Sequence, residues 1–108
     1  FEAQPANEAC KVGYMNRHGW VGYLVGGVLF VKQFTPQPDR AHVDFGCNAE
    51  MYCKDRFIEI ESVGPLTRVE PGQSVEHIEH WTLYPAPDTR PTHAGILELV
   101  KSLGLPLG

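Results

Sequence analysis

Residues Gly46–Tyr84 read GCNAEMYCKDRFIEIESVGPLTRVEPGQSVEHIEHWTLY and carry the strongest structural signal in the chain. Two strand-like runs, Arg56–Val63 and Val75–Tyr84, flank a segment that contains Gly64-Pro65 and Pro71-Gly72. Proline cannot donate a ladder hydrogen bond, and glycine adopts the dihedral angles that turns require. The pattern therefore predicts that the two runs pair with each other as antiparallel strands.

The same two runs are rich in ionisable side chains. Carboxylates and imidazoles stand where strands usually carry Val or Thr, namely at Glu59, Glu61, Glu76, His77, Glu79 and His80. Two interpretations are open: one face of the sheet is wet, or it lines a polar cleft. His77 and His80 are three residues apart, so on a strand they point to opposite faces and do not bind one metal ion together.

Length and composition limit the classes of protein to consider. The chain has 108 residues, which predicts a single domain over residues 1–108 with a loose lead-in at 1–10. No apolar run approaches the roughly 18–20 residues that span a membrane, so we expect no membrane insertion. The net charge is -4 and the basic residues are scattered, which argues against a nucleic-acid partner.

Three cysteines make an odd count, and their spacing matches no zinc site. We therefore expect no bound metal and no cofactor. Reduced thiols in a cytoplasmic protein are the favoured interpretation, and pairing of Cys47 with Cys53 is the alternative. The chain begins with Phe1 rather than methionine, so removal of an upstream segment is an open interpretation.

Further strands and one helix are predicted outside the two runs. Trp20–Val25 and Val28–Phe34 flank Gly26-Gly27, which is typical of a type I′ hairpin in which both central residues have positive φ. The second arm is apolar on both sides, as in a strand covered on both faces. Shorter strands are expected at Lys11–Met15 and Cys47–Lys54, and Pro65–Val69 is a candidate for another.

The C-terminal region predicts a helix. Residues 92–103 place Ile96, Leu97, Val100 and Leu103 on one helical face, and Gly104 supplies a stop, so the helical segment occupies 92–104. Together the elements predict a mainly β fold, an antiparallel β-sandwich with a C-terminal helix.

Four segments resemble one protein family: GWVGYLVGGVLFVKQF, GCNAEMY, FIEIESVGPL and VEPGQSVEHIEHWTLY. They are similar to the C-terminal part of the galactose mutarotase-like (aldose 1-epimerase-like) β-supersandwich proteins, most of all to uncharacterised bacterial members. The resemblance covers about Lys11–Tyr84. Members of that superfamily are usually more than twice as long, so the resemblance implies a half-supersandwich. Such a half would expose apolar faces and sheet edges, which predicts a homodimer.

The resemblance also implies candidate catalytic residues. Glu50 falls where the mutarotase glutamate lies and would act as the base in anomer interconversion, while His77 or His42 would supply the acid. The family's own acid histidines lie in the portion that has no counterpart here. The alternatives for Glu50 are a surface strand glutamate or a partner for Arg56 or Lys54, and the alternative for His77 is a cross-strand contact with Glu59 or Glu61.

Candidate ligand-binding residues come from flat aromatic side chains and from one loop. Trp20, Trp81 and Tyr52 offer surfaces on which a small sugar could stack, although such aromatics often fill a sandwich interior instead. Arg40 and Asp44 flank His42 in a proline-rich loop and offer hydrogen-bonding groups for sugar hydroxyls. Three functions follow: a carbohydrate-binding protein, an aldose epimerase, or a structural or interaction domain that keeps only the scaffold.

Overall fold

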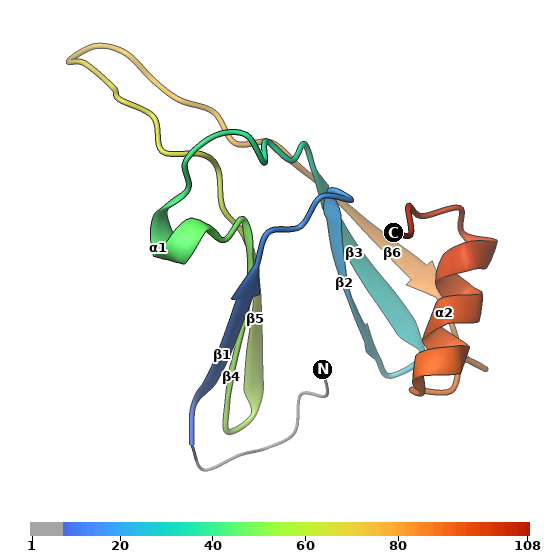
Figure 1. Cartoon of the computed structure of the whole chain (residues 1–108). Helices are drawn as coiled ribbons and strands as arrows, with labels where there is room; N and C mark the ends of the chain where they lie inside the picture. Colours follow the sequence, from blue (N-terminus) through green and yellow to red (C-terminus); the bar gives the residue numbers. More distant parts are fainter. Residues whose placement is uncertain (1–7) are drawn as a thin grey trace. The chain divides into compact units, whose positions relative to one another are not determined.

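The computed structural model describes residues 8–108, so the first seven residues of the predicted lead-in lie outside the described residues. The chain divides into two compact units. Unit 1 contains the described residues up to Arg17 and the segment Thr35–Ile78, and unit 2 contains His18–Phe34 and Glu79–Gly108. Each unit holds a three-stranded antiparallel sheet, and the last element of the chain is a helix (Figure 1). The predicted mainly β, antiparallel fold class with a C-terminal helix is confirmed.

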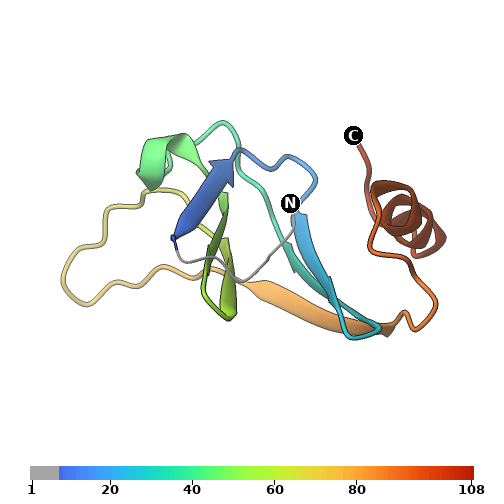
Figure 2. The same cartoon turned by 90° about the horizontal axis from the view of Figure 1, so that it is seen from below.

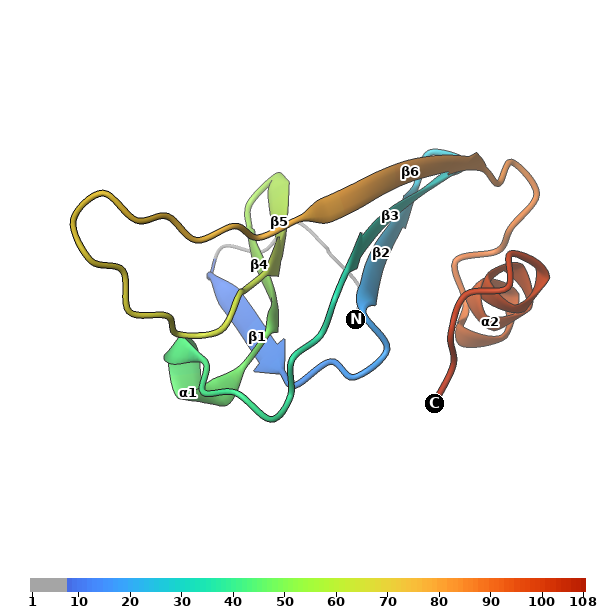
Figure 3. The same ribbon diagram turned by 90° about the horizontal axis from the view of Figure 1, so that it is seen from above.

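Unit 1 contains β1 (Cys10–Tyr14), β4 (Ala49–Lys54) and β5 (Phe57–Ser62), in the order β1-β4-β5. A turn at Asp55 joins β4 to β5, and Asp55 has a φ of 53°, which its short polar side chain tolerates better than most. Figure 3 shows β1, β4 and β5 with the long connection that leaves the end of β5.

The two faces of the unit 1 sheet differ in polarity. Successive side chains of a strand alternate between faces, so the register assigns each residue to a side. One face carries mainly apolar residues: Val12, Ala49, Met51, Cys53, Ile58 and Ile60. The other carries Lys11, Glu50, Tyr52, Glu59 and Glu61. Ile58 and Ile60 therefore lie on the face opposite Glu59 and Glu61.

The proline-rich loop that contains Arg40, His42 and Asp44 includes one short helical turn, α1 (Val43–Gly46). Asp44 and Phe45 both have positive φ, at 53° and 59°, so the turn is kinked. The backbone N–H of Leu66 donates to the carbonyl of Ala41 over 2.8 Å, which fastens this loop to the segment after β5.

Unit 2 contains β2 (Trp20–Val25), β3 (Val28–Phe34) and β6 (Glu79–Pro85), in the order β2-β3-β6. The predicted hairpin is confirmed: Gly26 and Gly27 have φ values of 57° and 74°. Figure 2 shows the hairpin in blue and teal with β6 in orange beside it. A β-carbon at Gly27 would also make a tight contact, 3.3 Å from the Pro87 Cα.

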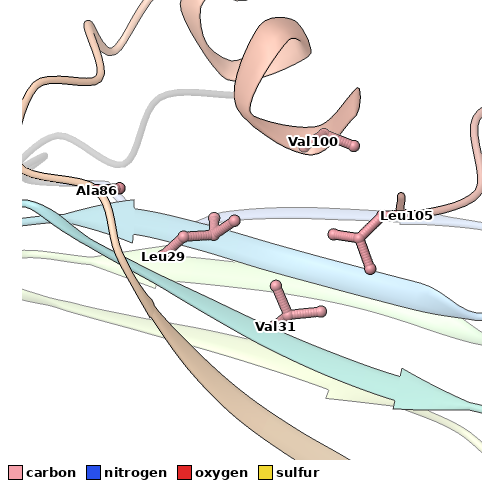
Figure 4. Packing of buried hydrophobic residues seen from close by; sticks show 5 residues of the cluster. All are labelled: Leu29, Val31, Ala86, Val100 and Leu105. Carbon is pink, nitrogen blue, oxygen red and sulfur yellow. The ribbon is translucent and has the colours of Figure 1, made fainter. Parts of the chain in front are cut away.

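The helix α2 (His93–Ser102) covers one face of the unit 2 sheet. The Thr92 side chain accepts a hydrogen bond from the Gly95 N–H at its start, and Gly104, with a φ of 68°, follows its end. The core gathers between helix and sheet and consists of Leu29, Val31, Ala86, Val100 and Leu105 (Figure 4). Burial of each large aliphatic side chain contributes about 1.5–3 kcal/mol. The predicted helical face is partly wrong, since Ile96 is exposed and Leu99 packs on the core.

The predicted pairing of Arg56–Val63 with Val75–Tyr84 is wrong. Strand β5 pairs with β4, while β6 begins only at Glu79 and pairs with β3 in the other sheet. A two-residue turn joins β4 to β5, so their pairing closes a much shorter loop than pairing across residues 63–78 would. Those sixteen residues contain Gly64-Pro65 and Pro71-Gly72 and form no strand, so the short strand considered at Pro65–Val69 is absent too.

Within residues 8–108, none of the helices has the length and apolar character needed to cross a membrane.

The chain passes between the two units at three points, after Arg17, Phe34 and Ile78, so each unit is assembled from separated segments.

Candidate functional site

Glu50 lies on the central strand of the unit 1 sheet and is buried, with 3% of its surface exposed. Its register partners are Gly13 on β1 and Glu61 on β5. The Lys11 Nζ lies 2.9 Å from one Glu50 carboxylate oxygen and 3.4 Å from a Glu61 oxygen, so one ammonium group bridges two carboxylates. The hydrogen bond to Glu50, together with the charge of Glu61, raises the pKa of Lys11 above its ordinary value of 10.5.

This arrangement favours a structural role for Glu50. A catalytic base must reach the proton that it abstracts, within about 2.6–3.2 Å or through one water. Here the carboxylate is almost fully buried and one of its oxygens is already engaged by Lys11. The partner that sequence reasoning offered, Arg56 or Lys54, is replaced by a lysine from the neighbouring strand β1.

The two histidines proposed as acids contact other groups. The His77 Nε2 lies 2.7 Å from the Ser62 hydroxyl, at the end of β5. Ser62 is paired with Ala49, so strand alternation places its side chain on the face opposite Glu50. The His42 Nδ1 lies 2.9 Å from the Arg40 carbonyl oxygen, within its own loop. His42 thus contacts a backbone carbonyl of its own loop and His77 a side-chain hydroxyl on β5, and neither contact involves the Glu50 carboxylate.

The predicted ligand-binding loop is internally bonded. The Arg40 guanidinium donates to the Gln37 side-chain oxygen and to the Thr67 hydroxyl, each over 3.4 Å. The Asp44 carbonyl accepts from the Cys47 N–H over 3.2 Å, closing the kinked turn. Beside it, Phe45 is fully exposed, although no pattern in the sequence predicted an exposed aromatic there. Tyr52 is half-buried and packs against Phe57 with ring centroids 5.9 Å apart.

Trp20 and Trp81, both in unit 2, have opposite environments. Trp20 packs against the core beneath α2, and its indole N–H donates to the Pro106 carbonyl over 2.7 Å. It therefore fills the interior, as the alternative interpretation held. Trp81 lies on the other face of the sheet and is 67% exposed.

Trp81 is exposed but firmly positioned. Its indole N–H donates to a Glu79 carboxylate oxygen over 2.9 Å, and the Phe30 ring meets it edge-on at 5.5 Å. Lys32, its register partner on β3, places Nζ 5.3 Å from the indole ring centroid. The same Nζ lies 3.3 Å from the other Glu79 oxygen. We call Lys32, Glu79 and Trp81 the indole platform.

The indole platform combines groups that sequence reasoning treated separately or missed. Trp81 and Glu79 were recognised individually, but Lys32 was overlooked. The alternation of Glu79, Trp81 and Leu83 along one strand face was a usable signal. The contribution of Lys32 depends on the pairing of β6 with β3, which the sequence did not predict.

A polar depression lies elsewhere in unit 2, beside α2. It is lined by the loop before the helix and by one side of the helix itself, including Asp88, Arg90, Glu98 and Ser102. None of the residues singled out from the sequence lines it. Among the described residues, no group of three His, Cys, Asp or Glu side chains could hold a metal ion.

No protein-family model, curated protein or solved structure is found to match this chain. The mutarotase-like relationship is thus a prediction from the residues alone. Function must be argued from the local geometry, because a scaffold by itself does not determine an activity.

Proposed function

We propose that this chain is a carbohydrate-binding protein whose ligand stacks on the indole of Trp81. The supporting observation is the combination of exposure and fixation: 67% of Trp81 is exposed while Glu79, Phe30 and Lys32 hold its ring. Ordering an exposed side chain costs conformational entropy. Because these contacts already hold the indole, a ligand that stacks on it does not have to order the ring on binding.

The chemistry of the indole platform suits a sugar. The apolar C–H face of a pyranose ring packs on an indole, and the surrounding hydroxyls need donors and acceptors nearby. The Glu79 carboxylate, whose side chain is 22% exposed, lies beside the indole and is the acceptor nearest to it. The Lys32 ammonium is 10% exposed and paired with Glu79, so it holds the carboxylate and the indole in place rather than contacting the ligand. A single stacked ring on an open face gives weak binding, so we expect a Kd of roughly 1 mM, which corresponds to about -4 kcal/mol.

The other two functions receive less support. An epimerase needs a base and an acid that converge on one substrate, and Glu50, His42 and His77 each have a local partner instead. An interaction domain would use apolar surface, and Leu83, 68% exposed, lies on the same face as Trp81. Titration with sugars distinguishes a carbohydrate-binding site at Trp81 from an apolar surface that binds another protein.

Nitrogen-15 NMR titration with a panel of monosaccharides and oligosaccharides, galactose and glucose included, tests the proposal. We expect the Trp81 indole N–H signal to move and that of Trp20, bonded to Pro106, to stay in place. W81A should abolish the shifts. F45A is the matched control, because Phe45 is also an exposed aromatic but lies in unit 1.

Either of two results overturns the proposal. One is the absence of any indole shift at sugar concentrations well above 1 mM, taken as the order expected for one stacked ring. The other is a shift that survives in W81A.

Two further expectations belong to this proposal. The three cysteines are free thiols, which suits a reducing compartment such as the cytoplasm.

The second expectation is a homodimer, because the exposed apolar side chains of Val25 and Leu83 suit association of two copies. Light scattering after size-exclusion chromatography measures the second, and a particle of 12.0 kDa would contradict it.

A further inference from the structure

Two of the three cysteines face each other across the β1–β4 pair. Cys10 and Cys53 are direct register partners, so their side chains project from the same face of the sheet. The Cα atoms of such partners in antiparallel strands lie about 4.5–5.5 Å apart. Disulfide-bonded cysteines have Cα separations of about 4.4–6.8 Å, so the backbone is already spaced for a bond. We propose that Cys10 and Cys53 are the site of a reversible disulfide and that Cys47 stays a thiol.

The environment of Gly13 excludes Cys47 from this pair. A β-carbon placed on Gly13 would lie 2.8 Å from the Cys47 Sγ, so that thiol sits on the side to which Gly13 would point. Gly13 is the register partner of Glu50, one position out of phase with Cys10 and Cys53. Because alternate residues face opposite sides, the Cys47 thiol lies on the Glu50 face and the other two lie on the apolar face.

The exposure of the two thiols sets the order of the reaction. Cys10 is exposed and Cys53 is 5% exposed, so an external oxidant reaches Cys10 first. With a low-molecular-weight disulfide as oxidant, the Cys10 thiolate attacks one sulfur and releases one thiolate, leaving a mixed disulfide. The Cys53 thiolate then attacks the Cys10 sulfur, forms the protein disulfide and releases the second thiolate. The two cysteines are oxidised, and the small disulfide is reduced to two thiols.

The bond would fasten an edge strand. β1 pairs with β4 and is the first strand in the sheet order, so it has one strand neighbour. Lys11, which follows Cys10, supplies the ammonium between Glu50 and Glu61. Oxidation therefore holds the start of β1, and with it Lys11, in place, whereas reduction leaves this end held by the ladder alone. The cross-link closes a long stretch of chain and should raise the thermal midpoint by roughly 10 °C.

The test equilibrates the full chain in mixtures of reduced and oxidised glutathione and then blocks free thiols with iodoacetamide. Trypsin leaves Cys47 and Cys53 in one peptide, so a protease that cuts after Glu50 is added to separate them. We expect mass spectrometry to find Cys10 joined to Cys53 and Cys47 alkylated. The fraction joined should fall as reduced glutathione increases.

Three variants complete the experiment. C47S should form the bond as the wild type does, while C10S should lose both the bond and the rise in thermal midpoint. C53S should lose the bond as well. Because Cys53 is buried, C53S can fail to fold, and C10S at the exposed position then tests the proposal alone. Glutathione held on Cys10 without transfer to Cys53 would overturn the proposal. So would a disulfide that contains Cys47, or a midpoint that oxidation leaves unchanged.

Discussion

The side-chain amide of Asn48 is hydrogen-bonded in both directions to the backbone of Asn16. Its Oδ1 accepts from the Asn16 N–H over 2.6 Å, and its Nδ2 donates to the Asn16 carbonyl over 2.8 Å. Both residues are buried, Asn48 fully. Asn16 follows β1 and Asn48 precedes β4, so the amide replaces the ladder where the two strands diverge.

We expect N48A to destabilise the protein by about 2–4 kcal/mol, because it leaves a buried N–H and a buried carbonyl without their partner. Urea unfolding followed by circular dichroism measures the change. N16A is the matched control: it keeps both backbone partners of Asn48 and loses the side-chain bond to the Tyr14 hydroxyl. Its cost should be about 1 kcal/mol. Equal losses in the two variants would contradict this account.

Local patterns in the sequence predicted most elements of the fold. The Gly26-Gly27 hairpin and the helix after Thr92 depend on neighbouring residues, and the structure contains both. Strand β4, expected within Cys47–Lys54, is also present. Such elements are specified by turn chemistry and capping, which a single sequence displays.

The sequence did not predict which strands pair across longer distances. The wrong prediction was the pairing of Arg56–Val63 with Val75–Tyr84. Strand β6 instead pairs with β3, more than forty positions earlier in the chain. Several apolar alternating strands are interchangeable by pattern, so register and partner depend on packing. The indole platform was not predicted for the same reason, because Lys32 and Trp81 meet only through the pairing of β3 with β6. The Lys11–Glu50 contact was not predicted either, because it requires β1 to pair with β4.

Gly13 tests the placement of Cys47. G13A should destabilise the protein by about 1–3 kcal/mol, because the new methyl group would lie 2.8 Å from the Cys47 Sγ. C47A removes that sulfur. The G13A substitution should therefore cost less stability when it is added to C47A than when it is added to the wild type. A thermal or urea double-mutant cycle gives the coupling. Strict additivity would show that the thiol lies elsewhere.

Lys11 should make stability depend on alkaline pH. Its pKa is raised in the folded state by Glu50 and Glu61, so the stabilisation is complete below the ordinary value of 10.5 and is lost as pH rises through the higher folded value. The difference in urea midpoint between wild type and K11M should be constant near neutrality and should shrink above pH 10.5. K54M, at the exposed end of the neighbouring strand, is the control. A difference that stays constant into strong alkali would contradict the assignment.

The ion pair of the indole platform should matter more for stability than a surface pair does. Lys32 and Glu79 have side chains 10% and 22% exposed, so E79Q leaves a nearly buried ammonium without its carboxylate. We expect a loss of about 2–4 kcal/mol. E70Q is the control, because Glu70 pairs with Arg68 at 53% and 88% exposure and should change stability by at most about 0.5 kcal/mol. Similar effects of the two variants in urea unfolding would contradict the burial argument.

Glu50 distinguishes the binding protein from the epimerase. Because the carboxylate is 3% exposed and bound to Lys11, we expect E50Q to lower stability by about 2 kcal/mol and to leave the sugar-induced shift of Trp81 unchanged. Exchange spectroscopy on galactose and glucose should show no acceleration of anomer interconversion by the wild-type chain. If the wild type does accelerate it and a folded E50Q does not, Glu50 touches the substrate. The Lys11–Glu50 ion pair would then have to open during catalysis, and the function would be that of an epimerase rather than a sugar-binding protein.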